Sequence, residues 1–453
     1  MTKVLSRFAS KLVLLLVFLL CASSVPAQHK MDGVTKARVK RMLKNVEKEI
    51  IKNYYDPTYH GMDVEKRFET AKEKLENTED IGRAFAVIAQ AVLDLNDSHT
   101  RFFPPSRAAI VSYGWRMRIY DDRAFITGVQ EESDAAKKGL EVGDEVLKLN
   151  GFHPTRKDLW KMIYYYQTLN PQTKLTLEVR KPGGETKVIE AESKIARLKA
   201  MVDLTDSLDF NAVTREGAKL ASNYKHYFSE MGTALVWKMP DFAFDPINVD
   251  GFIGRAKGKS TLILDLRGNP GGYVKTLEEL AGYFFSEDTK IADLKGRKEM
   301  DPQMAKTQGS DVFNGKVIVL VDSASASAAE IFARLMQITK RGIVLGDVSA
   351  GAVMQSQSVG FDAGVTTQIP YGMSLTNADV IMTDGKSIEH VGVTPDELII
   401  PTAEDLQQRR DPVLARALEL AGVKIDAAAA GKIFPEEKFI ERQSNIAINF
   451  QDF

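Results

Sequence analysis

The residues with the clearest chemical potential lie in a run of small side chains between Asp322 and Glu330. Ser323, Ser325 and Ser327 stand where an apolar strand ends and a helix begins. A serine at such a junction exposes its hydroxyl, and the helix N-terminus behind it presents unpaired N–H groups and a partial positive charge. A nucleophilic serine needs both features, for attack and for stabilising an oxyanion. Taken alone, however, the run favours a serine that only caps the helix.

A glycine-rich turn follows another apolar strand, over 261–266. The run Leu264–Gly272 ends in two adjacent glycines, Gly271 and Gly272. Glycines at a strand end let backbone N–H groups approach a ligand closely. This run alone favours a plain turn, but together with the serine segment it predicts the second half of an oxyanion hole.

The first residues have the pattern of a secretory signal peptide, residues 1–27. Lys3, Arg7 and Lys11 precede the apolar run Leu12–Leu20, and Val25-Pro26-Ala27 offers a cleavage site. The alternative, a transmembrane anchor, needs about 20 apolar residues. We therefore expect an exported protein, periplasmic or extracellular, without stable membrane insertion once the segment is removed.

Composition argues against several other kinds of chemistry. The 453 residues carry 60 Lys and Arg against 61 Asp and Glu, so no basic excess supports nucleic-acid binding. The glycine-rich turn lacks the Lys-Ser or Lys-Thr of a phosphate-binding loop. The six histidines show no ligand spacing, and the only cysteine, Cys21, lies in the signal segment. We expect no metal site, no cofactor and no cysteine nucleophile.

Three patterned regions must position these residues. Apolar residues at three- and four-residue steps predict a helical region over 30–108, and short strands predict a small β domain over 109–198. Between 225 and 420, apolar strands alternate with helices, which predicts a helix-covered sheet. Residues 421–453 form a weakly patterned tail. The expected fold class is α/β, a mixed α+β multidomain chain.

The ordered motifs resemble the tail-specific, or C-terminal processing, serine protease family. The resemblance covers about residues 34–420 and includes a PDZ-like domain between the helical region and the core. It rests on Leu264–Gly272, on Ser323–Ile331, on Asp97-Ser98-His99-Thr100 with Pro104-Pro105, and on the closing run Gly392–Asp396. It implies a serine peptidase that acts on polypeptide substrates.

The family's site residues can be transferred to matching positions. Counting back three places from the Glu of the serine motif makes Ser327 the implied nucleophile, with oxyanion donors at Ala328 and at Gly271 or Gly272. The PDZ-like resemblance makes Tyr113, Gly114 and Trp115 the loop that binds the substrate's terminal carboxylate. The alternative for that domain is a β-barrel used only for packing.

The general base is where this sequence departs from the family. Many members carry a lysine 25 residues after the nucleophile, and position 352 here is alanine. A branch that includes tricorn protease uses a histidine and a glutamate; Glu389 fits the glutamate, and Lys238 stands at the position taken to be the histidine's. The candidate bases are Lys238, His390 beside Glu389, and a histidine elsewhere such as His99.

These observations predict an exported serine peptidase that hydrolyses unstructured chains or tails through an acyl-enzyme on Ser327. The missing lysine motivates the alternative, a non-catalytic peptide-binding protein on the same fold. A carrier of apolar ligands is a weaker alternative that rests on fold analogy alone.

Overall fold

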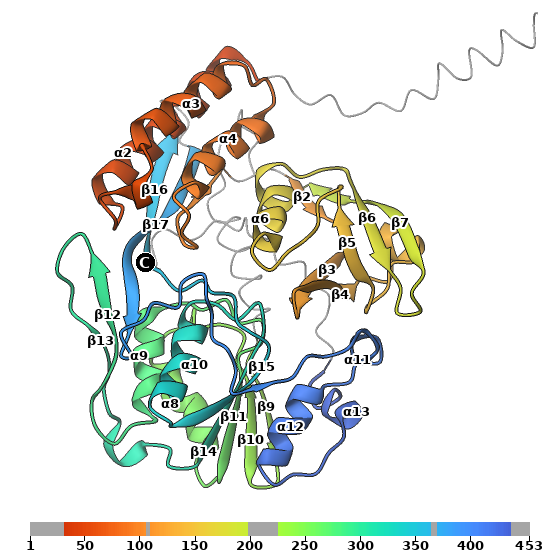
Figure 1. The fold of residues 1–453 in the computed structure, drawn as a ribbon, viewed down its shortest axis with the longest axis vertical. Coiled ribbons are helices and arrows are strands. Elements are labelled where there is room, and N and C mark those ends of the chain that lie inside the picture. The colour runs from red at the N-terminus through yellow and green to blue at the C-terminus, as the bar shows by residue number, and fades with distance from the viewer. Residues whose placement is uncertain (1–30, 106–108, 198–224, 364–368, 436–453) are drawn as a thin grey trace, which may run out of the picture.

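The computed structural model describes residues 31–105, 109–197, 225–363 and 369–435 (Figure 1). The expected signal peptide, residues 1–27, lies outside these ranges. Helices and sheets are mixed throughout, which confirms the predicted fold class. Within the described ranges, no helix combines the length and the apolar character needed to cross a membrane.

Three helices open the described chain, and each begins after an aspartate that caps it. Asp32, Asp63 and Asp80 accept hydrogen bonds from backbone N–H groups of the first helical turn. The apolar faces share one buried core with strands of a neighbouring sheet. The predicted helical region is thus confirmed over α2 (Gly33–Asn53), a 3₁₀ turn (Tyr59–Gly61), α3 (Val64–Glu76) and α4 (Ile81–Leu93).

A five-stranded sheet joins these helices to the core (Figure 1). Its longest strand, β17, pairs with β1 near one end, where Arg101 faces Ser374, and with β12 near the other, where Gly296 faces Ala378. The turn before β1, Asp97–Thr100, is thereby held beside the core. The strands are β1 (Arg101–Phe103), β12 (Thr289–Gly296), β13 (Gln303–Ala305), β16 (Gln355–Ala363) and β17 (Ile369–Met382).

Residues 109–197 form a separate small unit with its own core. A five-stranded antiparallel sheet has the order β3-β4-β5-β6-β7, so β3 and β7 are its edges. Its PDZ-like character stays a prediction. The elements are β2 (Ala109–Ser112), β3 (Trp115–Tyr120), β4 (Arg123–Val129), α5 (Asp134–Lys137), β5 (Glu145–Leu149), α6 (Leu159–Tyr164), a π-helical turn (Tyr165–Leu169), β6 (Lys174–Arg180), β7 (Thr186–Glu192) and β8 (Lys194–Arg197).

The core contains a six-stranded, mostly parallel sheet with helices on both faces (Figure 1). The strand order is β18-β15-β14-β11-β10-β9. Helices α8–α10 contribute to the buried cluster on one face, and α12 and α13 contribute to the cluster on the other. The predicted alternation of strands and helices is therefore confirmed.

The strands of this sheet are β9 (Tyr227–Met231), β10 (Ala234–Lys238), β11 (Thr261–Asp265), β14 (Lys316–Val321), β15 (Gly342–Gly346) and β18 (Glu397–Leu398). The helices around it are α8 (Asn248–Ile253), a 3₁₀ turn (Gly254–Ala256), α9 (Val274–Gly282), a second 3₁₀ turn (Gly309–Asp311), α10 (Ala328–Ile338), α11 (Ala403–Gln407), α12 (Pro412–Leu420) and α13 (Ala427–Ala430).

The small unit meets the core at the carboxyl edge of this sheet. Asp322 and Asp347 directly follow β14 and β15, and they form ion pairs with Arg118 at 2.6 Å and Arg156 at 2.9 Å. Both arginines belong to the 109–197 unit. Because ligands of α/β sheets bind outside the carboxyl ends of the strands, this edge is the place to look for a site.

Candidate active site

The three serines of the nucleophile motif have different environments. The Ser323 hydroxyl donates to the carbonyl of Ile119, and the fully buried Ser325 hydroxyl donates to the carbonyl of Leu266 at 2.8 Å. Ser327 is the N-cap residue of α10 and has a φ of 53°. Such a left-handed backbone costs about 1–3 kcal/mol and is typical of functional turns. The environments favour Ser327 as the nucleophile.

Gly271 packs directly against this serine. A Cβ atom at position 271 would lie 2.6 Å from the Cβ of Ser327 and 3.0 Å from the backbone nitrogen of Ala328. Its φ of 93° also disfavours any side chain. The glycine-rich turn and the serine turn, 56 positions apart in the printed sequence, are therefore in van der Waals contact.

Two backbone N–H groups beside Ser327 are suited to bind an oxyanion. Ala328 is the first residue of α10, so its N–H has no acceptor within the helix. The N–H of Gly271 donates to Asn269 Oδ1 at 2.9 Å. No residue of the described ranges accepts the N–H of Gly272. We therefore expect the donor pair to be Ala328 and Gly272, with Gly271 allowing their close approach.

Asp322 links the two turns. Its Oδ1 accepts from the N–H of Gly268 at 2.8 Å and from the N–H of Ala324 at 3.0 Å. Its other oxygen forms the ion pair with Arg118. One buried carboxylate thus fixes the oxyanion turn, the serine turn and the small unit relative to one another.

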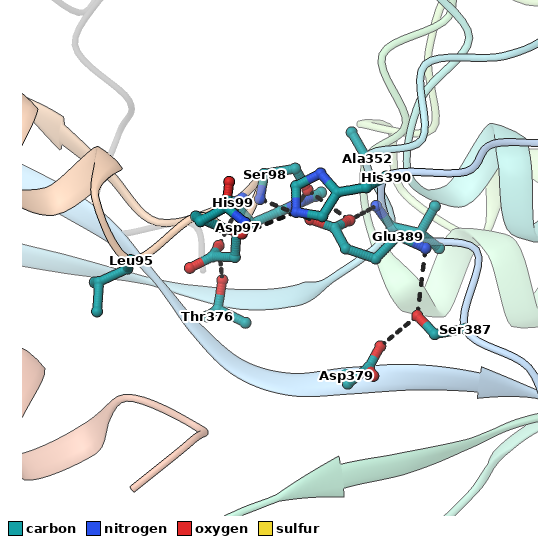
Figure 2. Close-up of polar contacts among 12 residues, drawn as sticks. Leu95, Asp97, Ser98, His99, Ala352, Thr376, Asp379, Ser387, Glu389 and His390 are labelled. Carbon is teal, nitrogen blue, oxygen red and sulfur yellow. Dashed lines mark hydrogen bonds and ion pairs between the residues drawn. The ribbon is translucent and has the colours of Figure 1, made fainter. Parts of the chain in front are cut away.

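Glu389 brings a distant segment to this region (Figure 2). Its Oε1 accepts from the N–H of Ser98 at 2.8 Å, and its Oε2 accepts from the Ser98 hydroxyl at 2.9 Å and from the N–H of Val353 at 2.8 Å. The carbonyl of Ala352, the residue before Val353, accepts a hydrogen bond from the backbone N–H of Ser327 at 2.7 Å. Burial raises the pKa of Glu389, and the N–H of Val353 is the strongest influence that lowers it again.

His99 is coupled to Glu389 through the Ser98 hydroxyl. Ser98 Oγ lies 2.7 Å from His99 Nδ1. Because this hydroxyl donates its proton to Glu389, it accepts from Nδ1–H, which leaves the lone pair of the imidazole on Nε2. Burial, helped by the charge of Arg101, lowers the pKa of His99 to about 4. The imidazole is therefore neutral near pH 7 and can accept a proton.

Asp97 holds the turn that carries this histidine (Figure 2). Its Oδ1 accepts from the N–H groups of His99 at 2.9 Å and Thr100 at 2.7 Å, and from the Thr376 hydroxyl of β17 at 2.6 Å. Its Oδ2 accepts from the Tyr54 hydroxyl at 2.9 Å. The His99 backbone is thus anchored to both the helical region and β17.

The other histidine candidate, His390, is half exposed. Its Nε2 donates to the carbonyl of Asn96 at 2.8 Å and lies 3.6 Å from Glu389 Oε1. The backbone N–H of His390 donates to the carbonyl of Gly351 at 2.8 Å. Glu389 and His390 are therefore together, as expected, but the ring of His390 is engaged with the loop that precedes His99.

Lys238 lies apart from this cluster. Alternate side chains of a strand point to the same face, so Lys238 lies on the face of Val236. The side chain of Val236 packs with α12 and α13, whereas Trp237 faces the helices α8–α10. The Lys238 ammonium lies 6.0 Å from the centre of the Phe434 ring on the same side as Val236. The lysine therefore occupies the face of the sheet opposite α10, which begins at the nucleophile.

The predicted carboxylate loop is at one edge of the small unit. Tyr113 is buried, and its hydroxyl bonds the carbonyl of Tyr166 and the N–H of Gln172. Gly114 has a φ of 71°, and a Cβ there would lie 2.3 Å from the Cβ of Ser133. Trp115 opens the edge strand β3. The peptide-binding role of these residues stays a prediction.

Comparison with known proteins identifies the core. Residues 236–399 match the profile described as peptidase family S41. The chain is therefore similar, in its core, to peptidase family S41. It is 24% identical over 395 residues to a CtpA-like serine protease of Staphylococcus haemolyticus, covering 83% of this chain and 68% of that protein. It is also 24% identical over 387 residues to the carboxy-terminal processing protease CtpB of Bacillus subtilis, covering 82% and 70%.

Solved structures share the fold of this chain. Mature CPAF aligns with a TM-score of 0.61 at 16% identity, over 82% of this chain and 94% of that one. The photosystem II D1 C-terminal processing protease aligns with a TM-score of 0.52 at 17% identity, over 86% and 98%. The resemblance to C-terminal processing proteases is confirmed, and these similarities identify the chain as a serine peptidase.

The contact between Gly271 and Ser327 predicts a sensitive position. Gly271→Ala should lower kcat on the order of 10²–10³-fold, because the new methyl group displaces the nucleophile and the oxyanion donor of Ala328. The control is Gly309→Ala, since Gly309 also has a positive φ of 58° but no atom within 4 Å of the added Cβ. Steady-state cleavage of a fluorogenic peptide tests this. Equal losses in both variants would contradict the contact's importance.

Proposed function

We propose that this chain is an exported serine peptidase of family S41 that cleaves unstructured polypeptide tails through an acyl-enzyme on Ser327. The observation that carries the proposal is the bonded chain from Ser327 N–H through the Ala352-Val353 backbone to Glu389, and from Glu389 through Ser98 to His99. It joins a nucleophile, a carboxylate and a neutral imidazole.

In the proposed reaction, His99 is the general base. Its Nε2 takes the proton from Ser327 Oγ while Oγ attacks the carbonyl carbon of the scissile bond. The oxyanion binds the N–H groups of Ala328 and Gly272. His99 then gives the proton to the departing amine, which leaves the acyl-enzyme. A water molecule, deprotonated by the same nitrogen, hydrolyses the ester and restores Ser327.

Glu389 takes the supporting role in this proposal. Proton transfer makes His99 an imidazolium, and the Ser98 hydroxyl relays the negative charge of Glu389 to its Nδ1–H. A carboxylate so placed holds the tautomer and stabilises the charge. The arrangement supplies a base although position 352 is alanine. It also weakens the case for a non-catalytic binding protein.

The substrate class follows from the small unit and from the relatives. The relatives are named C-terminal or carboxy-terminal processing proteases. In this chain the edge strand β3 can accept an extended peptide as an added strand, with Tyr113, Gly114 and Trp115 at the position for its terminal carboxylate. Residues 1–27 support export to the periplasm or the exterior.

A fluorophosphonate probe tests the nucleophile. Wild-type protein should be labelled and Ser327→Ala should not, because only a serine activated by a base reacts rapidly. Ser323→Ala is the control and should keep its labelling, since the Ser323 hydroxyl only bonds the Ile119 carbonyl. Absence of labelling in the wild type at every pH would instead favour the peptide-binding alternative.

Variants of the candidate bases separate the rival assignments. His99→Ala should lower kcat on the order of 10²–10⁴-fold, the range for a lost general base. His390→Ala should retain most of the rate because the His390 ring is bonded to the Asn96 carbonyl. Lys238→Met should also retain most of it, because Lys238 lies on the face of the sheet opposite α10. Ser98→Ala should fall between these results. If His99→Ala remained active while His390→Ala or Lys238→Met lost activity, the base assignment would be wrong.

Carboxylate recognition predicts a preference for free chain ends. A peptide with a free C-terminal carboxylate should have a higher kcat/KM than the same peptide ending in an amide, because the amide loses charge-assisted bonds to backbone N–H groups. A pair of fluorogenic peptides that differ only at this end measures the effect. Equal kcat/KM values would show that the enzyme does not recognise the terminal carboxylate.

A further inference from the structure

A buried glutamate directly below the nucleophile has no part in the mechanism so far. Glu330 is fully buried in the first turn of α10. Its Oε1 accepts from the Ser349 hydroxyl at 2.6 Å and the N–H of Gly351 at 2.7 Å. Its Oε2 accepts from the N–H groups of Ala352 at 2.9 Å and Ser327 at 3.1 Å. All of these partners act as donors.

This arrangement suits a charged carboxylate. Three of the partners are backbone N–H groups, which cannot accept a hydrogen bond. The fourth is the Ser349 hydroxyl, which also accepts the N–H of Val393 at 2.6 Å. A protonated Glu330 would place its own hydrogen against these donors and lose at least one of the bonds.

The bonds of Glu330 connect the nucleophile to the loop that precedes Val353. Ser327 is held at its strained φ of 53° while its N–H faces both Glu330 and the Ala352 carbonyl. Gly351 in turn accepts the N–H of His390. Val353, next to Ala352, donates to Glu389. A change at Glu330 would therefore move Ser327 and the loop over residues 349–353. That loop bonds Glu389, the carboxylate proposed to support His99.

We propose that Glu330 is a positioning residue whose negative charge holds Ser327 and residues 349–352 in the reactive arrangement, and whose protonation releases them. This inference rests on the proposed function. It gives the peptidase a pH gate separate from its general base.

The electrostatics place this gate near neutral pH. Burial raises the pKa of Glu330 to about 7, and the four hydrogen bonds oppose the rise. The base titrates elsewhere, because the pKa of His99 is about 4. Activity should therefore decline as the pH falls through 7, although His99 stays neutral. Since the raised pKa means that protonation of Glu330 favours the folded state, the titration of Glu330 itself does not unfold the protein.

The other ionisable groups around α10 are engaged with partners of their own. Glu389 is the nearest in the bonded chain, reached through Val353. Further groups pair as follows: Glu278 with Met304 N–H, Glu279 with Gln308, Lys316 with the Leu420 carbonyl, Asp322 with Arg118, Arg334 with Asp384, Arg341 with the Phe284 carbonyl, Asp347 with Arg156, Asp379 with Ser387, His390 with the Asn96 carbonyl, and Asp396 with Gln337.

The test is the rate of Ser327 labelling by a fluorophosphonate between pH 5.5 and 9, with circular dichroism at each pH. Wild-type labelling should fall below pH 7, approaching about tenfold per pH unit, with an unchanged spectrum. Glu330→Gln should label at least about tenfold more slowly at pH 8, because its amide faces two donors, and should lose the step near pH 7. Glu278→Gln, the control, alters another glutamate of raised pKa and should keep the wild-type profile.

Each outcome decides the matter. A wild-type rate that is flat from pH 8 to 5.5, or a step near 7 that survives in Glu330→Gln, overturns the inference while leaving Ser327 as nucleophile. If Glu330→Gln does not fold, the wild-type profile and spectrum still decide it. Absence of Ser327-dependent labelling in the wild type at every pH overturns the proposed function itself.

Discussion

The buried carboxyl of Glu389 is the contact on which the rest of the site depends. It bonds Ser98, 291 positions away in the chain, and it bonds Val353 beside the loop that holds the nucleophile. A buried carboxylate is costly unless donors compensate it, and these hydrogen bonds provide the compensation. The helical region, the long strand β17 and the closing loop therefore have to be in place together before the proposed base and nucleophile can cooperate.

The nucleophile turn is stabilised by constraints from several sides. Gly271 packs on one side of Ser327, Asp322 ties the neighbouring backbone to the oxyanion turn, and Glu330 bonds the Ser327 N–H. Each constraint is buried, so water cannot substitute for it. Together they offset the free-energy cost of the left-handed backbone at Ser327. The small unit takes part through Arg118, whose ion pair with Asp322 ties that unit to the turn that would bind the oxyanion.

Much of this arrangement could be predicted from the sequence. Strands and helices with regular apolar patterns were predictable, including a strand over 316–321 and a helix over 328–338 that match β14 and α10. Ser327 and Glu389 could be selected because they lie within local motifs. The environments of Ser327 and Gly271 agree with the oxyanion turn expected from the glycine pattern.

The base could not be selected in the same way. The nearness of His99 to Glu389 depends on the pairing of β1 with β17 and on the buried Asp97, which are contacts between distant segments. The role of Ser98 as a bridge has no sequence pattern beyond its place before the histidine. Lys238 was a candidate because it stands at the position taken to be the histidine's in the branch that includes tricorn protease. The rest of β10 is apolar, so its sequence does not reveal which face of the strand meets α10.

In the proposed mechanism, Ser327 reacts with the help of His99 rather than of His390 or Lys238. A crystal structure of the wild-type protein after reaction with a fluorophosphonate tests this most directly. We expect phosphorus bonded to Ser327 Oγ, a phosphonyl oxygen accepting from the N–H groups of Ala328 and Gly272, and His99 Nε2 facing Oγ. An adduct on another residue, or an adduct at Ser327 with His99 turned away and a different basic group in its place, would contradict it.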